Sequence, residues 1–133
     1  MKNLSFQKKI INAPISIGEL VDKITILEIK KNKLQNSKLK NVLKELNYLR
    51  ELIEKNKIEI TDDLFSQLKE VNLSLWDIED QIRIKEKNKE FDNIFIELAR
   101  SVYFTNDKRS EIKKRINRLS NSEITEEKSY AEY

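Results

Sequence analysis

The chain has 133 residues, a formal net charge of +3 and 37% charged residues, with one glycine and one proline. This length suits a single domain over residues 1–133. The shortage of turn-forming residues excludes folds built mainly from sheets, and the abundant lysine, glutamate and leucine favour long helices. We therefore predict an all-α fold, a compact helical bundle built on a long antiparallel helical hairpin.

The composition also excludes several kinds of chemistry. The chain has no cysteine and no histidine, so disulfides, thiolate nucleophiles, imidazole bases and Cys/His metal sites are impossible. The carboxylates near residue 20 lack repeated E-x-x-E spacing, so no metal or cofactor is expected. Only six of the 26 basic residues are arginine, which argues against nucleic-acid binding.

The sequence shows no feature of a membrane protein. No apolar run approaches the length of a membrane span. Lys8 and Lys9 stand where a signal peptide would need its apolar region. We therefore expect a cytoplasmic protein without membrane contact.

The first predicted helix begins after an irregular arm. Residues 1–13 show no helical period, and whether this arm packs on the body or forms a short strand stays open. Pro14 disfavours a helix before it. Ser16 and Glu19 form the S-x-x-E capping-box pattern, so we predict a helix over residues 17–34.

Two stretches carry apolar residues at heptad spacing. One runs over residues 39–53, and the other over residues 62–88 with Thr61 or Asp62 as its cap. Their short connection predicts that these two helices pair as the antiparallel hairpin. The same seams could instead pair two copies of the chain, so a homodimer is an alternative.

Two further helices and a tail are predicted at the C-terminal end. Apolar residues at 91–102 and at 112–119 indicate separate helices, with a break at residues 105–107. Residues 108–118 are strongly basic, whereas residues 120–133 are acidic. We predict that the tail docks back on the basic helix; the alternative is that both are solvated.

The candidate site residues are those polar or aromatic positions that a hydrophobic core does not require. They are Glu19, Asp22, Lys23, Asn72, Trp76, Glu79, Arg83, Arg100, Tyr103, Asn106, Asp107, Arg109, Lys128 and Tyr130. No catalytic residue is predicted among them. The set could line a pocket for a small anion, or it could form a structural network that ties the helices and the tail together.

Within this set, two groups of residues are each expected to cluster at a place of their own. The stripe from Asn72 to Arg83 has spacings of four, three and four, which place it at the edge of the core seam. The residues from Arg100 to Arg109 crowd the break between the last two helices. If Asn106 caps the fifth helix, the first N–H groups there could hold an anion; a capped turn with local ion pairs is the alternative.

Four stretches resemble one family of short bacterial and phage-associated helical proteins, catalogued only as a domain of unknown function. They are P-I-S-I-G-E-L-V-D-K-I-T-I-L-E-I-K at 14–30, V-N-L-S-L-W-D-I-E-D-Q-I-R at 71–83, F-I-E-L-A-R-S-V-Y-F-T-N-D-K-R-S-E-I-K-K-R-I-N at 95–117 and E-E-K-S-Y-A-E-Y at 126–133. The resemblance covers the whole chain in order. It implies a compact helical domain that includes the tail, and no established activity.

The predicted function is a binding or protein-interaction module whose partner is a protein or a small anionic ligand. A small all-α enzyme is the alternative, because arginine and lysine that grip a dicarboxylate are the chorismate-mutase strategy. The stretch E-L-V-D-K-I-T-I-L at 19–27 is similar to the opening helix of that family. A homodimeric structural protein is the other alternative.

Overall fold

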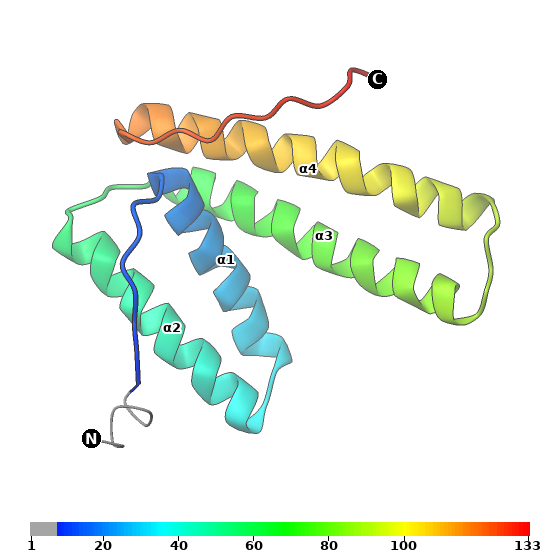
Figure 1. The fold of residues 1–133 in the computed structure, drawn as a ribbon, viewed down its shortest axis with the longest axis horizontal. Helices are drawn as coiled ribbons and strands as arrows, with labels where there is room; N and C mark the ends of the chain where they lie inside the picture. The colour runs from blue at the N-terminus through cyan, green and yellow to red at the C-terminus, as the bar shows by residue number, and fades with distance from the viewer. Residues whose placement is uncertain (1–7) are drawn as a thin grey trace.

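The computed structural model describes residues 8–133, which hold four helices and no strand. They are α1 (Ile17–Lys33), α2 (Asn36–Lys55), α3 (Asp62–Lys87) and α4 (Asn93–Leu119). Figure 1 shows two antiparallel hairpins, α1 with α2 and α3 with α4, and α1 also packs on α3 and α4. The predicted all-α fold with a long antiparallel hairpin is confirmed. In this part of the chain, none of the helices has the length and apolarity that a membrane crossing requires.

The long hairpin is made by α3 and α4, so the predicted pairing of α2 with α3 is wrong. The backbones of α2 and α3 do not approach each other, and the close helix neighbour of α2 is α1. Val42 and Leu46 of α2 share a core cluster with α1, whereas Leu68 of α3 shares one with Ile116 of α4. Heptad spacing defines which face of a helix is buried, but it does not choose the neighbour that buries it.

The predicted break at residues 105–107 is also wrong, because α4 continues through it. The helix begins at Asn93 instead, where the Asp92 carboxylate accepts a hydrogen bond from the backbone N–H of Phe95 at 3.0 Å. Capping residues are tolerated inside a helix when their side chains point outward, and Asp107 is exposed there. The fifth helix and its anion-binding N-terminus therefore do not exist.

The helix starts that rest on local capping signals are confirmed. The Ser16 hydroxyl accepts from the backbone N–H of Glu19 at 3.0 Å. The Thr61 hydroxyl accepts from the backbone N–H of Leu64 at 3.2 Å. Such caps use only neighbouring residues, so they can be recognised without knowledge of the tertiary fold.

The N-terminal arm is irregular from residue 8 to the start of α1. Ile10 and Ile11 are exposed, so they do not pack on the body. The first seven residues of the predicted arm lie outside the described residues.

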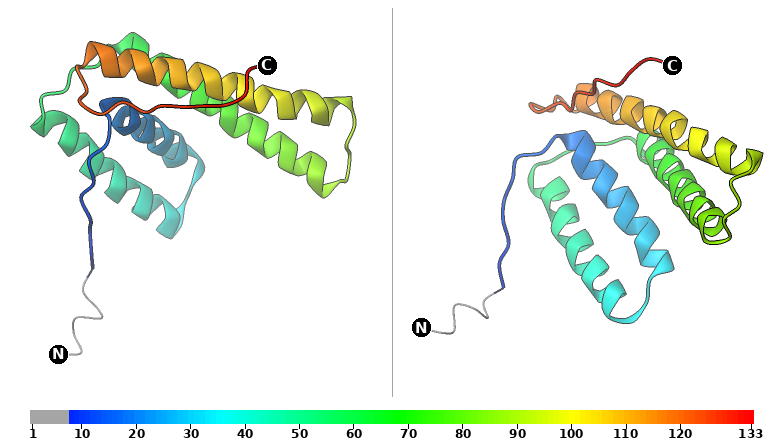
Figure 2. Two further views of the ribbon diagram at one scale, coloured as in Figure 1. Left: turned by 45° about the horizontal axis from the view of Figure 1, so that its top comes forward. Right: turned by 45° about the vertical axis from the view of Figure 1, so that its right-hand side comes forward.

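The tail over residues 120–133 runs back along α4, and Figure 2 shows the two side by side in both views. The Glu126 carboxylate accepts a hydrogen bond from Lys113 at 2.8 Å. The Tyr133 ring packs against Tyr103 and Phe104, with ring centroids 5.2 and 4.9 Å apart. The predicted docking of the tail is confirmed.

Half of the α3–α4 hairpin projects beyond the cover of α1 and α2 (Figures 1 and 2). The buried residues of α3 all lie between Leu64 and Asn72, and those of α4 all lie between Ile112 and Asn117. We call residues 73–104, which contain no buried side chain, the distal hairpin.

Candidate functional site

A buried polar network lies where α1 crosses α3 and α4. The Asp22 carboxylate of α1 is 1% exposed. It accepts two hydrogen bonds from Arg109 of α4, from Nε to Oδ1 at 2.9 Å and from Nη2 to Oδ2 at 2.5 Å. The Asn72 amide of α3 donates to Asp22 Oδ1 at 2.9 Å and to the Thr25 hydroxyl at 2.8 Å. We call these four residues the crossing network, and they join three helices.

A lysine bridge runs beside the crossing network. Lys113 of α4 is 10% exposed at its side chain and donates to two carboxylates. Its Nζ lies 2.7 Å from Glu19 Oε2 on α1 and 2.8 Å from Glu126 Oε1 on the tail. This bridge therefore attaches the tail to both helices.

The N-terminus of α1 is capped by distant parts of the chain. Asn117 Oδ1 accepts from the backbone N–H of Gly18 at 2.7 Å, and Ser122 Oγ accepts from that of Ile17 at 3.0 Å. The first N–H groups of a helix lack partners within the helix and attract anions. Here the oxygens of α4 and of the tail already fill that role.

The charges of the network are mutually stabilised. Burial would raise the pKa of the Asp22 carboxyl, but hydrogen bonds from Arg109 and Asn72 outweigh it and hold that pKa below its usual value. Burial would likewise lower the pKa of Lys113, but its two carboxylate partners hold that pKa above its usual value. Both groups therefore stay charged at neutral pH, and neither is poised to exchange a proton there.

The arrangement has the form of a structural network. Among the described residues, every buried side-chain nitrogen or oxygen has a hydrogen-bond partner. The two cations that could grip an anion, Arg109 and Lys113, are already paired with carboxylates of the same chain. Within residues 8–133, no group of three or more carboxylates is placed to hold a metal ion.

The structure brings four of the sequence-predicted residues together and leaves the others apart. Glu19, Asp22, Asn72 and Arg109 belong to the network and its bridge. The residues outside it are Lys23, Trp76, Glu79, Arg83, Arg100, Tyr103, Asn106, Asp107, Lys128 and Tyr130.

The stripe on α3 enters the network only at Asn72. Trp76 is half-buried beneath Lys33, whose Nζ lies 5.6 Å from the ring centroid. Glu79 and Arg83 form an exposed pair at 3.5 Å. The stripe divides in this way because α1 covers only the first half of α3 (Figure 1).

The predicted residues of α4 and the tail are mostly at the surface. Arg100 pairs with Glu97 at 2.9 Å, and Asn106 is half-buried. The Asp107 carboxylate accepts a hydrogen bond from the Tyr133 hydroxyl. Exposed contacts of this kind contribute little to stability.

The tail contributes one more cation–aromatic contact. Lys128 lies over the ring of Tyr130, with its Nζ 5.7 Å from the centroid. Both side chains are exposed, so they stay outside the network.

Sequence reasoning missed the network roles of Thr25, Lys113 and Asn117. A signal for the last two was present. Arg109, Lys113 and Asn117 follow one another at intervals of four, which places them on one face of a helix. The three positions already lie on the predicted basic helix over residues 108–118, so this signal could be read from the sequence.

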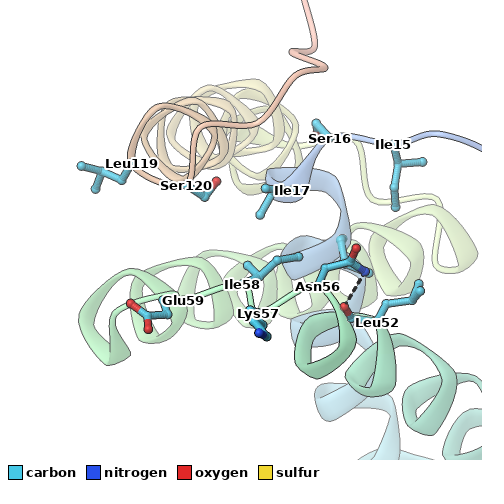
Figure 3. Close-up of a pocket in the computed structure, with 11 residues that line it drawn as sticks. Ile15, Ser16, Ile17, Leu52, Asn56, Lys57, Ile58, Glu59, Leu119 and Ser120 are labelled. Atoms are coloured by element: carbon cyan, nitrogen blue, oxygen red, sulfur yellow. Dashed lines mark hydrogen bonds between the residues drawn. The ribbon is translucent and has the colours of Figure 1, made fainter.

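A hollow of about 590 Å³, lined by both polar and apolar side chains, lies apart from the network, where α1 begins and where α2 and α4 end. Its polar lining residues are Ser16, Asn56, Lys57, Glu59 and Ser120. Figure 3 shows side chains of these helices and of the α2–α3 connection around it. Its apolar lining residues are Ile15, Ile17, Leu20, Leu52, Ile58 and Leu119. None of the sequence-predicted site residues lines this hollow.

Over residues 8–133, the fold and the network define a class of protein with four helices in two hairpins, which a buried carboxylate–guanidinium network holds together. The chain belongs to DUF6165, a family of unknown function whose model matches residues 11–133. The resemblance to such a family is thereby confirmed, and the match includes all four helices and the tail. No curated protein and no solved structure matches the chain.

Stability is expected to fall in acid because of these carboxyl groups. The pKa of Glu126 is held below its usual value by the Lys113 hydrogen bond, and that of Asp22 is held low by Arg109 and Asn72 despite burial. As the pH falls below about 4, the unfolded chain binds these protons before the folded chain does, so protonation favours unfolding.

Urea unfolding measured at pH 7, 5, 4 and 3 checks this prediction. Asp22→Asn is the matched variant, and its stability should change less between pH 5 and pH 3 than that of the wild type. Equal pH dependence of the two proteins would show that folding does not lower the pKa of the Asp22 carboxyl.

Proposed function

We propose that the chain is a protein-interaction module that binds its partner through the distal hairpin. The observation that carries this proposal is the exposure of large apolar side chains at 40% or more of their surface. They are Leu73, Ile84, Phe91, Ile94 and Ile96. Exposed apolar residues that gather on one surface mark places where another protein binds, and Leu73 and Ile84, which are eleven positions apart on α3, lie on the same face of that helix.

The shape of the distal hairpin supports the same proposal. Its two helices are closed at the tip by Lys85, which pairs with Glu90 at 3.2 Å and with Asp92 at 2.9 Å. A projecting pair of helices offers an amphipathic helix of a partner a ready-made face on which to pack. The module is then divided into a scaffold half around the crossing network and a binding half beyond it.

Other partner classes receive less support. A small anion would need Arg109 or Lys113, and both cations are paired within the chain. The same pairing disfavours an enzyme that grips a dicarboxylate. Nucleic acid needs a basic surface, so the distal hairpin does not suit it, because residues 73–104 contain more acidic than basic side chains. The proposal retains the cytoplasmic location expected from the sequence, which cell fractionation checks.

Photo-crosslinking in cells tests the proposal. A photoreactive amino acid is placed at Ile84 or Ile94 of the distal hairpin, and at Tyr48 of α2 as the control, because Tyr48 is 48% exposed. We expect a discrete crosslinked protein from both hairpin positions and none from Tyr48. No product from the hairpin positions, or the same products from Tyr48, would contradict the proposal.

A substitution separates binding from folding. With the photoreactive amino acid at Phe91, the double substitution Ile84→Lys and Ile94→Lys should abolish the crosslinked product. The urea midpoint should stay the same, because both isoleucines are exposed (57% and 59%). A product of unchanged yield would show that the distal hairpin is not the binding surface.

A further inference from the structure

An exposed segment with two isoleucines and the hollow at the end of α2 adjoin each other at the start of α1. Ile10 is 67% exposed and Ile11 is 88% exposed. The hollow begins at Ile15, only a few residues further along the chain, and its wall includes Leu52 and Leu119, which are 41% and 72% exposed. Contact between the segment and the hollow would remove apolar surface of both from water.

The residues at the root of the segment direct it away from its own hollow. Pro14 restricts Ala13 to extended conformations, and its own φ is fixed by the ring. Figures 1 and 2 show the segment leaving the bundle on the side away from α4. Ile10 and Ile11 are thus better placed to enter the hollow of another molecule.

We propose that two copies of the chain exchange these segments, so that Ile10 and Ile11 of each copy pack on the apolar side chains of the other copy's hollow. The segment and the hollow belong to the same chain, so each copy gives one contact and receives one, as a two-fold dimer requires. Residues 8–13 span about 20 Å when extended, which is enough to cross between two hollows that face each other.

Charge at the rim of the hollow is compatible with this exchange. Lys8 and Lys9 precede the two isoleucines. Glu59 and Lys57 both lie exposed on the wall of the hollow. Glu59 can pair with either lysine of the entering segment, whereas Lys57 adds a charge of the same sign as theirs. This surface is separate from the distal hairpin, so the dimer and the partner complex can exist together.

Engineered cysteines test the exchange directly, because the chain has no cysteine of its own. A chain with Ile11→Cys is mixed with a chain with Leu119→Cys and oxidised, and we expect a disulfide-linked dimer of the two variants. The control mixture pairs Ile11→Cys with Tyr48→Cys, which lies on α2 outside the hollow. Since a disulfide needs Cα atoms within about 7 Å, the control should give at least about tenfold less product.

Sedimentation at several concentrations provides the second measurement. The wild type should become dimeric as concentration rises. Ile11→Asp and Leu119→Asp should each raise the dissociation constant at least about tenfold, with an unchanged urea midpoint because both side chains are exposed.

Three results would overturn the exchange. They are a monomer at every concentration, equal disulfide yield in the Tyr48 control, or a disulfide within one molecule when Ile11→Cys and Leu119→Cys are on the same chain. The last result would place the segment in its own hollow.

Discussion

Replacement of Asp22 with alanine is expected to lower the free energy of unfolding by about 3 kcal/mol, since removal of one member of a buried ion pair leaves its partner uncompensated. Asp22 is 1% exposed and accepts hydrogen bonds from Arg109 and Asn72. Arg109 is 29% exposed at its side chain and can reach water, which keeps the loss at the lower end for such pairs. Urea unfolding monitored by circular dichroism measures the change.

Glu79→Ala is the matched control for this substitution. Glu79 also pairs with an arginine, Arg83, but the two side chains are 49% and 77% exposed. Loss of an exposed pair costs less than about 0.5 kcal/mol. If Asp22→Ala and Glu79→Ala unfolded at the same urea concentration, the crossing network would not be what holds the two hairpins together.

Gly18→Ala is expected to lower the free energy of unfolding by about 2 kcal/mol, although alanine is the better helix former. A Cβ atom at Gly18 would lie 2.7 Å from the backbone oxygen of Lys113 and 2.9 Å from Asn117 Oδ1. The first of these atoms belongs to the α4 backbone and cannot rotate away. α1 would therefore have to move off α4, and its cap from Asn117 would be lost.

For Gly18→Ala, helix propensity predicts a higher free energy of unfolding and close packing predicts a lower one. The sign of the measured change therefore decides between the two effects. Ser74→Ala, at an exposed position of α3, is the control and should leave stability equal or slightly higher. A gain in stability from Gly18→Ala would show that α1 and α4 are not in close contact at this residue.

The fold could be predicted from the sequence where the signals are local. Thr61 caps α3, and Ser16 with Glu19 caps α1, because each cap uses only residues within one helical turn. Asn106 and Asp107 also resemble capping residues, but the break in the helix predicted from them was wrong. The α4 helix continues through them because it packs against α3 along its length, and this tertiary contact outweighs the weak preference of Asn and Asp for helix ends.

The network could be predicted only in part, because its members come from three helices and the tail. Asp22, Asn72 and Arg109 stood out as polar positions that a core does not need. Lys113 and Asn117 did not, because Lys113 is one of six basic residues within 108–118 and a lone asparagine in a helical pattern carries no distinctive signal. The distances that join Asp22 to Asn72 and Arg109 depend on how α1 crosses α3 and α4, and no pattern within one helix encodes that crossing.

The distant cap of α1 has a consequence for the order of folding. Gly18 and Asn117 are 99 positions apart in the chain, and Ile17 and Ser122 are 105 positions apart. Each hairpin can form early from contacts between neighbouring helices, whereas contacts between distant residues are slow because a long loop must close first. The N–H groups of Ile17 and Gly18 therefore gain their partners only when both ends of the chain have come together, which makes this part of the cap a late event in folding.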